Sequence, residues 1–527
     1  MNFKLKLPIA IAMLSMMTLS CQNPNENLQT EAKDGESSSL ASIKEKYNTN
    51  IPDKILTPDV VETRLGTLNF FDGLPSEETV VKVYDNLDFM RAVETFLNGI
   101  PATSIEGIRL GLEEAGSKSS NQVVIFDDLM DSNPLFLTGN TSTVYATSFL
   151  DLKKDGPTVV EIPARCGPGT VNDAYFRFVV DMGAPGPDRG KGGKYLILPP
   201  DYEGDVPEGY FVAKSTSYVN WLILRGFLVD GSPDFSSQMF RDGLKIYPLK
   251  DIGNRPTMEF VNGSKKLFNT IHANNEDFYE ELNDVIQREP VSFLDPELRG
   301  LFASIGIEKE KPFNPDARMK AILTDAVAVG NATARAITFK TREKESSIFK
   351  TGQWESGFIG GNYQWLKNEG KGGRFLDART RFFYAATVNT PAMVLKMIGL
   401  GSQYAIAFLD GKGEYLDGNK NYSLTIPANV PAKDFWSIVM YDPQTRSELQ
   451  TSQALPSISS QRTPLVENED GSVTLYFGAT NNAPKGMEAN WLQSVPGKGF
   501  FVIFRLYGPL DPWFDQTWQP GDFEEIN

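Results

Sequence analysis

The chain has 527 residues, of which 41% are hydrophobic and 22% charged, and this composition excludes a disordered, collagen-like or coiled-coil protein. The formal net charge of −16 would repel a phosphate backbone, so we expect no nucleic acid partner. With one histidine, His272, and two cysteines, the chain cannot form a three-imidazole site or a Cys/His zinc cage, and the sequence assigns no metal ligands. Nothing in the composition identifies a cofactor.

The N-terminus has the pattern of a secretory signal, which we predict over residues 1–20. Lys4 and Lys6 precede an apolar stretch over residues 7–19, and a small residue, Ser20, follows it. The stretch is too short to be a comfortable permanent membrane span. The sequence therefore predicts export.

Cys21 follows the small residue directly and resembles the lipidated cysteine of a bacterial lipobox. This resemblance implies a lipid anchor as the only membrane contact, and Gln22 resembles the signal for outer-membrane sorting. Residues 21–48 are polar and predict a solvated tether. We expect an outer-membrane lipoprotein of the cell envelope that faces the periplasm; the alternative is cleavage and secretion without a lipid.

Residues 49–250 are predicted to form an N-terminal domain with a helical lead-in and a β-sandwich. Two short amphipathic helices are predicted around Leu87–Leu97 and Ile105–Leu112. Seven β-branched or aromatic runs without helical patterns between them then favour a sandwich or barrel. These runs are Val123–Phe126, Val144–Phe149, Thr158–Ile162, Tyr175–Val180, Tyr195–Leu198, Tyr210–Ala213 and Trp221–Leu228.

Residues 251–400 are predicted to be a helical connector, and residues 401–527 a second β-sandwich. Helical spacing predicts a helix over Glu276–Gln287, and Asn314 and Thr390 are expected to cap two more helices, each with proline at the next position. Strands are then predicted over Tyr404–Leu409, Tyr422–Ile426, Trp436–Tyr441, Val473–Phe477 and Phe500–Leu506. The predicted fold class is mainly β with α, two β-sandwich-like domains joined by helices.

Several strings resemble exported bacterial proteins that combine domain of unknown function 1254 with domain of unknown function 1214. Asn140 to Tyr145, Val159 to Pro163 and Trp221 to Arg225 resemble the first domain. Asn490 to Leu492 and Gly499 to Pro509 resemble the second. The resemblance implies two β-sandwich-like domains joined by helices in the cell envelope, and it implies no reaction.

Five polar residues are the candidates for a functional site. His272 precedes a predicted helix and could act as a general base, with a packing role as the commoner alternative. Arg225 and Arg505 each interrupt an apolar strand, so each guanidinium needs either an internal carboxylate or an anionic ligand. Asn140 and Tyr145 complete the candidate ligand-binding set, and Cys166 is expected to be a core or loop thiol, with a nucleophile as the alternative.

The string Gly-Lys-Gly-Gly occurs at residues 190–193 and 370–373, each time followed by a basic residue and an aromatic one. It suggests either a duplicated functional loop or two ordinary turns.

For the protein as a whole, the leading hypothesis is an enzyme that acts on a small periplasmic molecule in a pocket between the domains. The alternative is a non-catalytic ligand-binding or scaffold protein, and convergence of the polar candidates in one pocket would argue against a scaffold.

Overall fold

The computed structural model describes residues 49–527, so the predicted signal peptide, Cys21 and the tether lie outside the described residues. The chain divides into two compact units at Leu74 and Pro75. In the first unit, β1 (Val60–Thr63) pairs antiparallel with β2 (Gly66–Phe71), and β3 (Leu74–Pro75) is the third strand of this sheet.

A single helix, α1 (Glu77–Ala115), replaces the two short helices predicted between residues 87 and 112. The Ser76 side chain caps its start by accepting from the Thr79 amide, and Gly116 ends it with a φ of 117°. Pro101 lies inside the helix and has no amide hydrogen to donate to the Leu97 carbonyl. The Thr380 hydroxyl donates to that carbonyl instead, at 3.5 Å, so a contact distant in sequence helps the helix to continue.

Glycines on α1 allow another segment to cross it closely. A Cβ at Gly111 would lie 2.3 Å from the Asn269 carbonyl oxygen, and one at Gly107 would lie 2.7 Å from that of Thr270. Both contacts are with backbone, which cannot easily move aside. The two glycines therefore fix where the segment leading to His272 passes.

Two sheets form the N-terminal sandwich. One has the order β13-β4-β5-β11-β7-β8 and the other the order β10-β9-β6-β12. Buried aliphatic side chains such as Val144, Leu224 and Ile197 fill the space between them. The strands are β4 (Gln122–Ile125), β5 (Val144–Asp151), β6 (Thr158–Ile162), β7 (Pro168–Asp173), β8 (Phe178–Gly183), β9 (Gly193–Leu198), β10 (Phe211–Lys214), β11 (Val219–Gly226), β12 (Lys245–Pro248) and β13 (Glu259–Asn262). Short helices α2 (Leu152–Asp155) and α3 (Asp234–Gly243) connect them.

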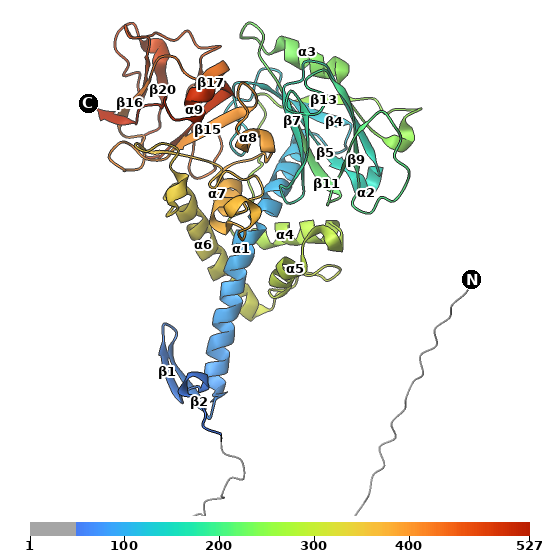
Figure 1. Cartoon of the computed structure of the whole chain (residues 1–527), viewed down its shortest axis with the longest axis vertical. Helices are drawn as coiled ribbons and strands as arrows, with labels where there is room; N and C mark the ends of the chain where they lie inside the picture. The colour runs from blue at the N-terminus through green and yellow to red at the C-terminus, as the bar shows by residue number, and fades with distance from the viewer. Residues whose placement is uncertain (1–48) are drawn as a thin grey trace, which may run out of the picture. The chain divides into compact units, whose positions relative to one another are not determined.

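The central helices pack around α1, as Figure 1 shows. They are α4 (Asp277–Arg288), α5 (Pro296–Ala303), α6 (Ala317–Phe339) and α7 (Leu376–Ala385), followed by the single turn α8 (Pro391–Val394). The cap of α6 is Asp316, which accepts from the Met319 amide, and not Asn314 as the sequence predicted. Thr390 caps α8 as predicted.

The C-terminal sandwich packs a sheet of order β14-β15-β21-β17-β18 against one of order β20-β19-β16-β22. The strands are β14 (Trp354–Glu355), β15 (Ser402–Ala407), β16 (Asn421–Ile426), β17 (Ala432–Tyr441), β18 (Ser457–Ser459), β19 (Val473–Gly478), β20 (Trp491–Gln493), β21 (Phe501–Pro509) and β22 (Glu524–Ile526), with helix α9 (Asp511–Phe514) near the end. The two sandwiches lie above the central helices in Figure 1. This confirms the predicted fold class, mainly β with α.

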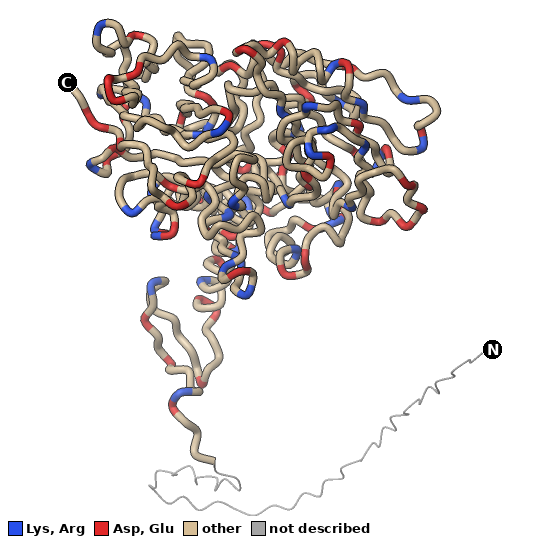
Figure 2. Tube along the Cα trace, turned by 45° about the horizontal axis from the view of Figure 1, so that its top comes forward, with Lys and Arg blue, Asp and Glu red and all other residues tan. Residues whose placement is uncertain are grey.

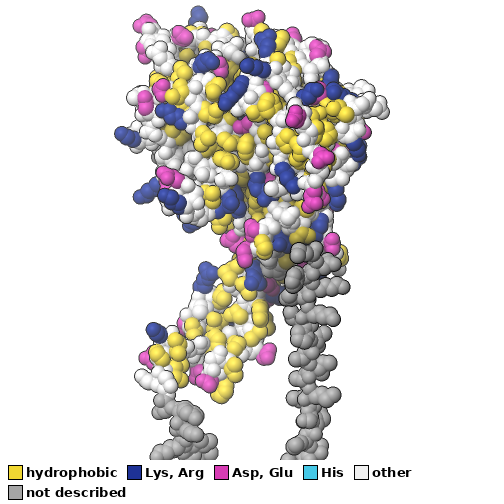
Figure 3. Space-filling model, turned by 45° about the vertical axis from the view of Figure 1, so that its right-hand side comes forward, with side chains coloured by type: hydrophobic (Ala, Val, Ile, Leu, Met, Phe, Trp, Pro, Cys, Tyr) yellow, Lys and Arg dark blue, Asp and Glu magenta, His cyan; other side chains and the backbone are white. Residues whose placement is uncertain are grey.

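Acidic and basic residues alternate along the second unit, and neither sign forms a continuous stripe in Figure 2. Hydrophobic side chains are interspersed with charged ones on the face in Figure 3, where no histidine is visible. Over residues 49–527 no helix is long and apolar enough to cross a membrane.

Candidate functional site

Each sandwich places one buried arginine opposite a tyrosine on the neighbouring strand. On β11, Arg225 is paired in register with Tyr145 of β5, and its guanidinium lies 5.5 Å from the centre of that ring. On β21, Arg505 is paired with Tyr404 of β15, 5.9 Å from the ring centre. The two sheets therefore present the same arginine–tyrosine arrangement.

Both pairs line one cavity of about 50 Å³, which we call the Arg225–Arg505 cavity. Asn140 also lines it and donates from its side-chain amide to the Tyr507 hydroxyl at 2.5 Å. Four of the five polar residues selected from the sequence thus meet in one place. The complete lining is Thr138, Asn140, Tyr145, Arg225, Gly357, Phe358, Phe382, Ala386, Thr387, Met393, Tyr404, Ile406, Ile503 and Arg505.

The two guanidiniums are buried without a paired carboxylate. Arg225 is 8% exposed and Arg505 is 4% exposed. Buried Arg381 pairs with Glu355, whereas neither of these two arginines forms an ion pair within the part of the chain that the structure describes. Arg505 donates from Nη2 to the Gly139 carbonyl at 3.5 Å, and its Nη1 has no hydrogen-bond partner.

The surroundings keep both guanidiniums charged. Burial by itself lowers the pKa of Arg225 and of Arg505, but electrostatic interaction with the surrounding tyrosines, first Tyr145 for Arg225 and first Tyr441 for Arg505, raises it above the ordinary value. Burial raises the pKa of Tyr507, so its hydroxyl stays neutral. The cavity is therefore lined by two cations and neutral phenols, which suits an anion.

Two carboxyl groups, the half-buried Asp181 and the buried Glu448, interact with these arginines from a longer range. Asp181, near Arg225, has its pKa raised to about 6 by burial. Glu448, near Arg505, has its pKa raised to about 8 by burial, with the nearby charge of Asp131 adding to the effect and those of Arg505 and Arg462 opposing it. At neutral pH Glu448 is mostly protonated, so it does not neutralise Arg505.

A wider cleft of about 450 Å³ adjoins the cavity, because Phe358 and Tyr404 line both. Apolar side chains such as Ile348 and Trp513 contribute to its walls, with Gly360 and Gly361 beside them. The arrangement is a small cationic chamber beside a larger cleft, and the lining of that cleft also includes the polar side chains Glu345, Ser356 and Gln403.

The structure places His272 outside this cavity. The side chain is 2% exposed, its ring packs against Phe278 and Tyr384, and its Nδ1 lies 2.8 Å from the Ala273 carbonyl oxygen. The pKa of His272 is lowered to about 3 by burial and by the charge of Arg446. The ring is neutral, but it is sealed from solvent and has no route to a substrate in this conformation.

The remaining candidate for chemistry, Cys166, is also buried and does not line the Arg225–Arg505 cavity. Cys166 is a free, buried thiol, and burial and the charge of Asp188 raise its pKa, so it is a poor nucleophile. Within residues 49–527 no group of three His, Cys, Asp or Glu side chains could hold a metal ion. Sequence reasoning missed Tyr404 and Glu448; the first had a signal, since it begins a predicted apolar strand, and the second had none.

Comparisons with known protein families account for both sandwiches. Residues 120–248 match a protein of unknown function, DUF1254, and residues 401–511 match a second, DUF1214. The chain combines these two domains in that order. Tyr145 and Arg225 belong to the DUF1254 domain, and Tyr404 and Arg505 to the DUF1214 domain, so each contributes one arginine–tyrosine pair to the cavity.

A solved structure shares the fold of this chain, and its description names no activity. The VPA0106 protein from Vibrio parahaemolyticus is similar to 84% of this chain over 100% of its own length, with 17% sequence identity and a TM-score of 0.52. An uncharacterized protein from Burkholderia cenocepacia covers 84% of this chain and 96% of its own at 12% identity, with a TM-score of 0.38. A search of curated proteins gave no match.

Proposed function

We propose that this protein binds a small carboxylate between its DUF1254 and DUF1214 domains. One observation carries the proposal: Arg225 and Arg505, each more than nine-tenths buried and without an ion pair among the described residues, line the same cavity. Burying an unpaired cation is costly, and a carboxylate with two oxygens can accept from both guanidiniums.

The adjoining cleft indicates the shape of the ligand. The cavity of about 50 Å³ has room for little more than the carboxylate group itself. A short apolar tail would pass between Phe358 and Tyr404 into the cleft of about 450 Å³. A monocarboxylate with a short hydrocarbon chain fits both spaces.

The lining favours binding over acid–base catalysis. None of the fourteen lining residues is a carboxylate or a histidine, so the cavity has no conventional general base. The hypothesis of an enzyme would require Glu448 or another group to move towards the ligand. We therefore place binding first and an enzymatic role second.

We also propose that the protein is exported and anchored in the cell envelope through a lipid on Cys21. Support comes from the sequence of residues 1–48, which the structure does not describe. In this proposal the tether holds the folded part beside the membrane, where the binding site faces the periplasm.

Calorimetric titration with the series acetate, butyrate and hexanoate tests the binding proposal. Affinity should rise along the series, because each buried CH₂ contributes about 0.8 kcal/mol. Arg225→Gln should weaken hexanoate binding at least tenfold, which corresponds to about 1.4 kcal/mol. The control Arg255→Gln removes the same charge from an arginine that pairs with Glu161 and is 38% exposed, and it should leave affinity unchanged. Equal affinities for the two variants would refute the site.

A further inference from the structure

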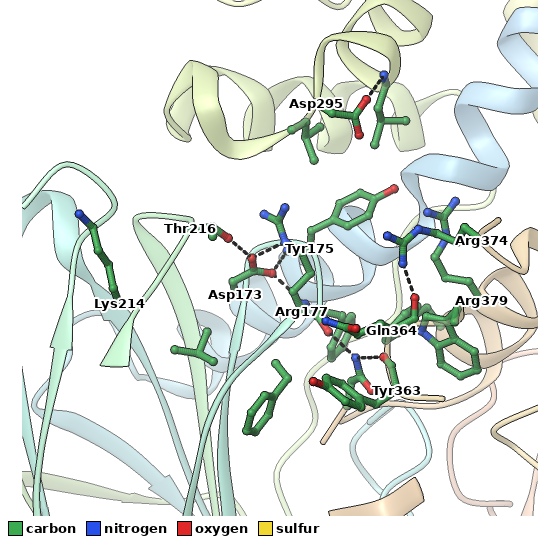
Figure 4. Close-up of a pocket in the computed structure, with 18 residues that line it drawn as sticks. Asp173, Tyr175, Arg177, Lys214, Thr216, Asp295, Tyr363, Gln364, Arg374 and Arg379 are labelled. Carbon is green, nitrogen blue, oxygen red and sulfur yellow. Dashed lines mark hydrogen bonds and ion pairs between the residues drawn. The ribbon is translucent and has the colours of Figure 1, made fainter. Parts of the chain in front are cut away.

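A second cavity, of about 310 Å³, lies on another side of the DUF1254 domain, and no residue lines both it and the Arg225–Arg505 cavity. The turn between β7 and β8, the start of α5 and the segment before α7 surround it (Figure 4). We call it the Arg374–Arg379 cavity. Its lining is Asp173, Tyr175, Phe176, Arg177, Phe178, Val179, Lys214, Thr216, Leu294, Asp295, Leu298, Tyr363, Gln364, Trp365, Arg374, Arg379, Phe383 and Asn389.

The two carboxylates that line this cavity already accept hydrogen bonds from other groups of the protein. Asp173 is fully buried and accepts from the Arg177 guanidinium at 2.6 Å, from the Thr216 hydroxyl at 2.6 Å and from two backbone amides. Asp295 caps α5 by accepting from the Leu298 amide at 2.9 Å. Neither carboxylate pairs with Arg374 or Arg379.

Arg374 and Arg379 lie beside each other at one end of the cavity, with Lys214 at the other end (Figure 4). Partial desolvation of its guanidinium and the charges of Arg379 and Arg177 lower the pKa of Arg374, although its side chain is exposed at one side, and Tyr175 and Asp295 oppose this effect. Arg379 is 6% exposed; it donates to the Asn98 side chain at 2.5 Å, while its Nε has no partner. At this end of the cavity, the positive charge of the arginines therefore exceeds the negative charge of the carboxylates that line it.

The cavity also has an apolar wall formed by aromatic rings. Six of the lining residues are aromatic: Tyr175, Phe176, Phe178, Tyr363, Trp365 and Phe383. Trp365 is 3% exposed, and its indole N–H is buried without a hydrogen-bond partner. Arg374 already donates from Nη1 to the Gln364 carbonyl, whereas the Arg379 Nε and the Trp365 indole N–H have no acceptor among the described residues. These unsatisfied donors point to an acceptor that a ligand would supply.

We infer that the Arg374–Arg379 cavity binds an aromatic molecule with a single anionic group. The anion is held by Arg374 and Arg379, and the ring lies among the aromatic walls. A volume of about 310 Å³ falls at the lower end of the range for small-molecule sites, and suits one or two fused rings. The second Gly-Lys-Gly-Gly string ends at Gly373 and thus carries Arg374 into the site, whereas the first leads to Lys194, which pairs with Glu161.

Calorimetric titration of the full chain with 2-naphthoate tests this site, with 2-naphthyl phosphate as a second anion and neutral 2-naphthamide as the control ligand. Both anions should bind at least tenfold more tightly than the amide, and the tighter of the two identifies the anionic group. Arg374→Gln should weaken the binding of both at least tenfold. The matched variant Lys371→Gln removes the same charge from an exposed residue of the same loop that does not line the cavity, and should have no effect.

Arg505→Met separates this inference from the proposed function, because it alters only the other cavity and should leave 2-naphthoate affinity unchanged. Arg374 is exposed, so its variant should fold, and circular dichroism checks this. Equal affinity for naphthoate and naphthamide, or equal losses in Arg374→Gln and Lys371→Gln, would overturn the inference. A loss in Arg505→Met but not in Arg374→Gln would assign naphthoate to the first cavity and overturn it as well.

Discussion

Burial of Arg505 affects the stability of the folded protein as well as its proposed ligand binding. Its guanidinium is 96% buried, by difference from the 4% that is exposed, and Nη1 makes no hydrogen bond. A buried guanidinium that has no paired carboxylate and one unpartnered Nη1 keeps a donor open for a ligand, at some cost in stability. A purely structural arginine would instead be satisfied within the protein.

Replacing Arg505 with Met separates these two roles. Met has a similar length and no charge, so in the absence of ligand we expect the free energy of unfolding to stay the same or rise by about 1 kcal/mol. Hexanoate affinity should fall at least tenfold in the same variant. Urea denaturation and calorimetry measure the two quantities, and a loss of stability of about 3 kcal/mol would mark Arg505 as structural.

Glu448 should make stability depend on pH. Its pKa in the folded protein, about 8, lies above the ordinary value of 4.5. The folded state therefore keeps a proton that the unfolded state releases, and this contribution to stability is complete below pH 4.5 and is lost progressively up to about pH 8.

The variant Glu448→Gln cannot lose that proton. Between pH 6 and 8.5 the free energy of unfolding of the wild type should fall by ~2 kcal/mol more than that of the variant. Glu281 and Glu289, whose pKa values are raised to about 7, contribute equally to both proteins and cancel in the comparison. Parallel pH profiles from urea denaturation would show that Glu448 is ionised in the folded state.

At the level of single residues, the sequence could identify the arginines but not their environment. Arg225 and Arg505 stand out because each interrupts an apolar strand. The sequence left an internal carboxylate and an anionic ligand as the two possible partners, and the structure places a tyrosine ring beside each guanidinium. His272 was misleading for the opposite reason, because its neighbours in sequence, Ala273 and Asn274, do not reveal that Phe278 and Tyr384 enclose it.

Among the elements, α1 depends on close contact with the segment that crosses it. Gly111→Ala would place a Cβ 2.3 Å from the Asn269 carbonyl oxygen, so we expect the free energy of unfolding to fall by about 2 kcal/mol. Gly300→Ala in α5 is the matched control, because its Cβ would meet nothing within 4 Å. There alanine should leave stability unchanged or raise it by up to about 1 kcal/mol, and urea denaturation compares the two. Similar effects at both positions would mean that the crossing is not tight.

Helices and strands with hydrophobic residues on only one face could be predicted from the sequence, and those buried on all sides could not. The predicted strand Thr158–Ile162 coincides with β6, and the predicted helix Glu276–Gln287 differs from α4 by one residue at each end. In contrast, residues 378–385 of α7 are all buried, including Arg379, Thr380 and Arg381, so the polar residues of this helix do not mark an exposed face. Strand β7 begins with Pro168 and Gly169, which resemble a turn.

At the scale of the whole molecule, the order of the two domains could be predicted from the resemblance, but the cavity could not. Tyr145, Arg225 and Arg505 come from strands separated by up to 360 positions, the difference between residues 505 and 145. Strand periodicity shows which face a side chain occupies in its own sheet. It does not show which other sheet that face meets.

Anchoring of the whole protein through Cys21 also belongs to this scale. Cys21→Ser should move the protein from the membrane fraction to the soluble fraction, because a lipid on Cys21 is the only membrane attachment that the sequence predicts. Fractionation followed by immunoblotting measures the distribution. Equal membrane association of wild type and variant would refute lipidation at this position.

A crystal structure of the protein grown with hexanoate would show directly whether a carboxylate occupies the Arg225–Arg505 cavity. We expect both carboxylate oxygens within hydrogen-bonding distance of the two guanidiniums, and the hydrocarbon chain directed past Phe358 and Tyr404 into the adjoining cleft. A cavity that stays without hexanoate, or in which a carboxylate of the protein itself pairs with Arg225 or Arg505, would contradict the proposed function.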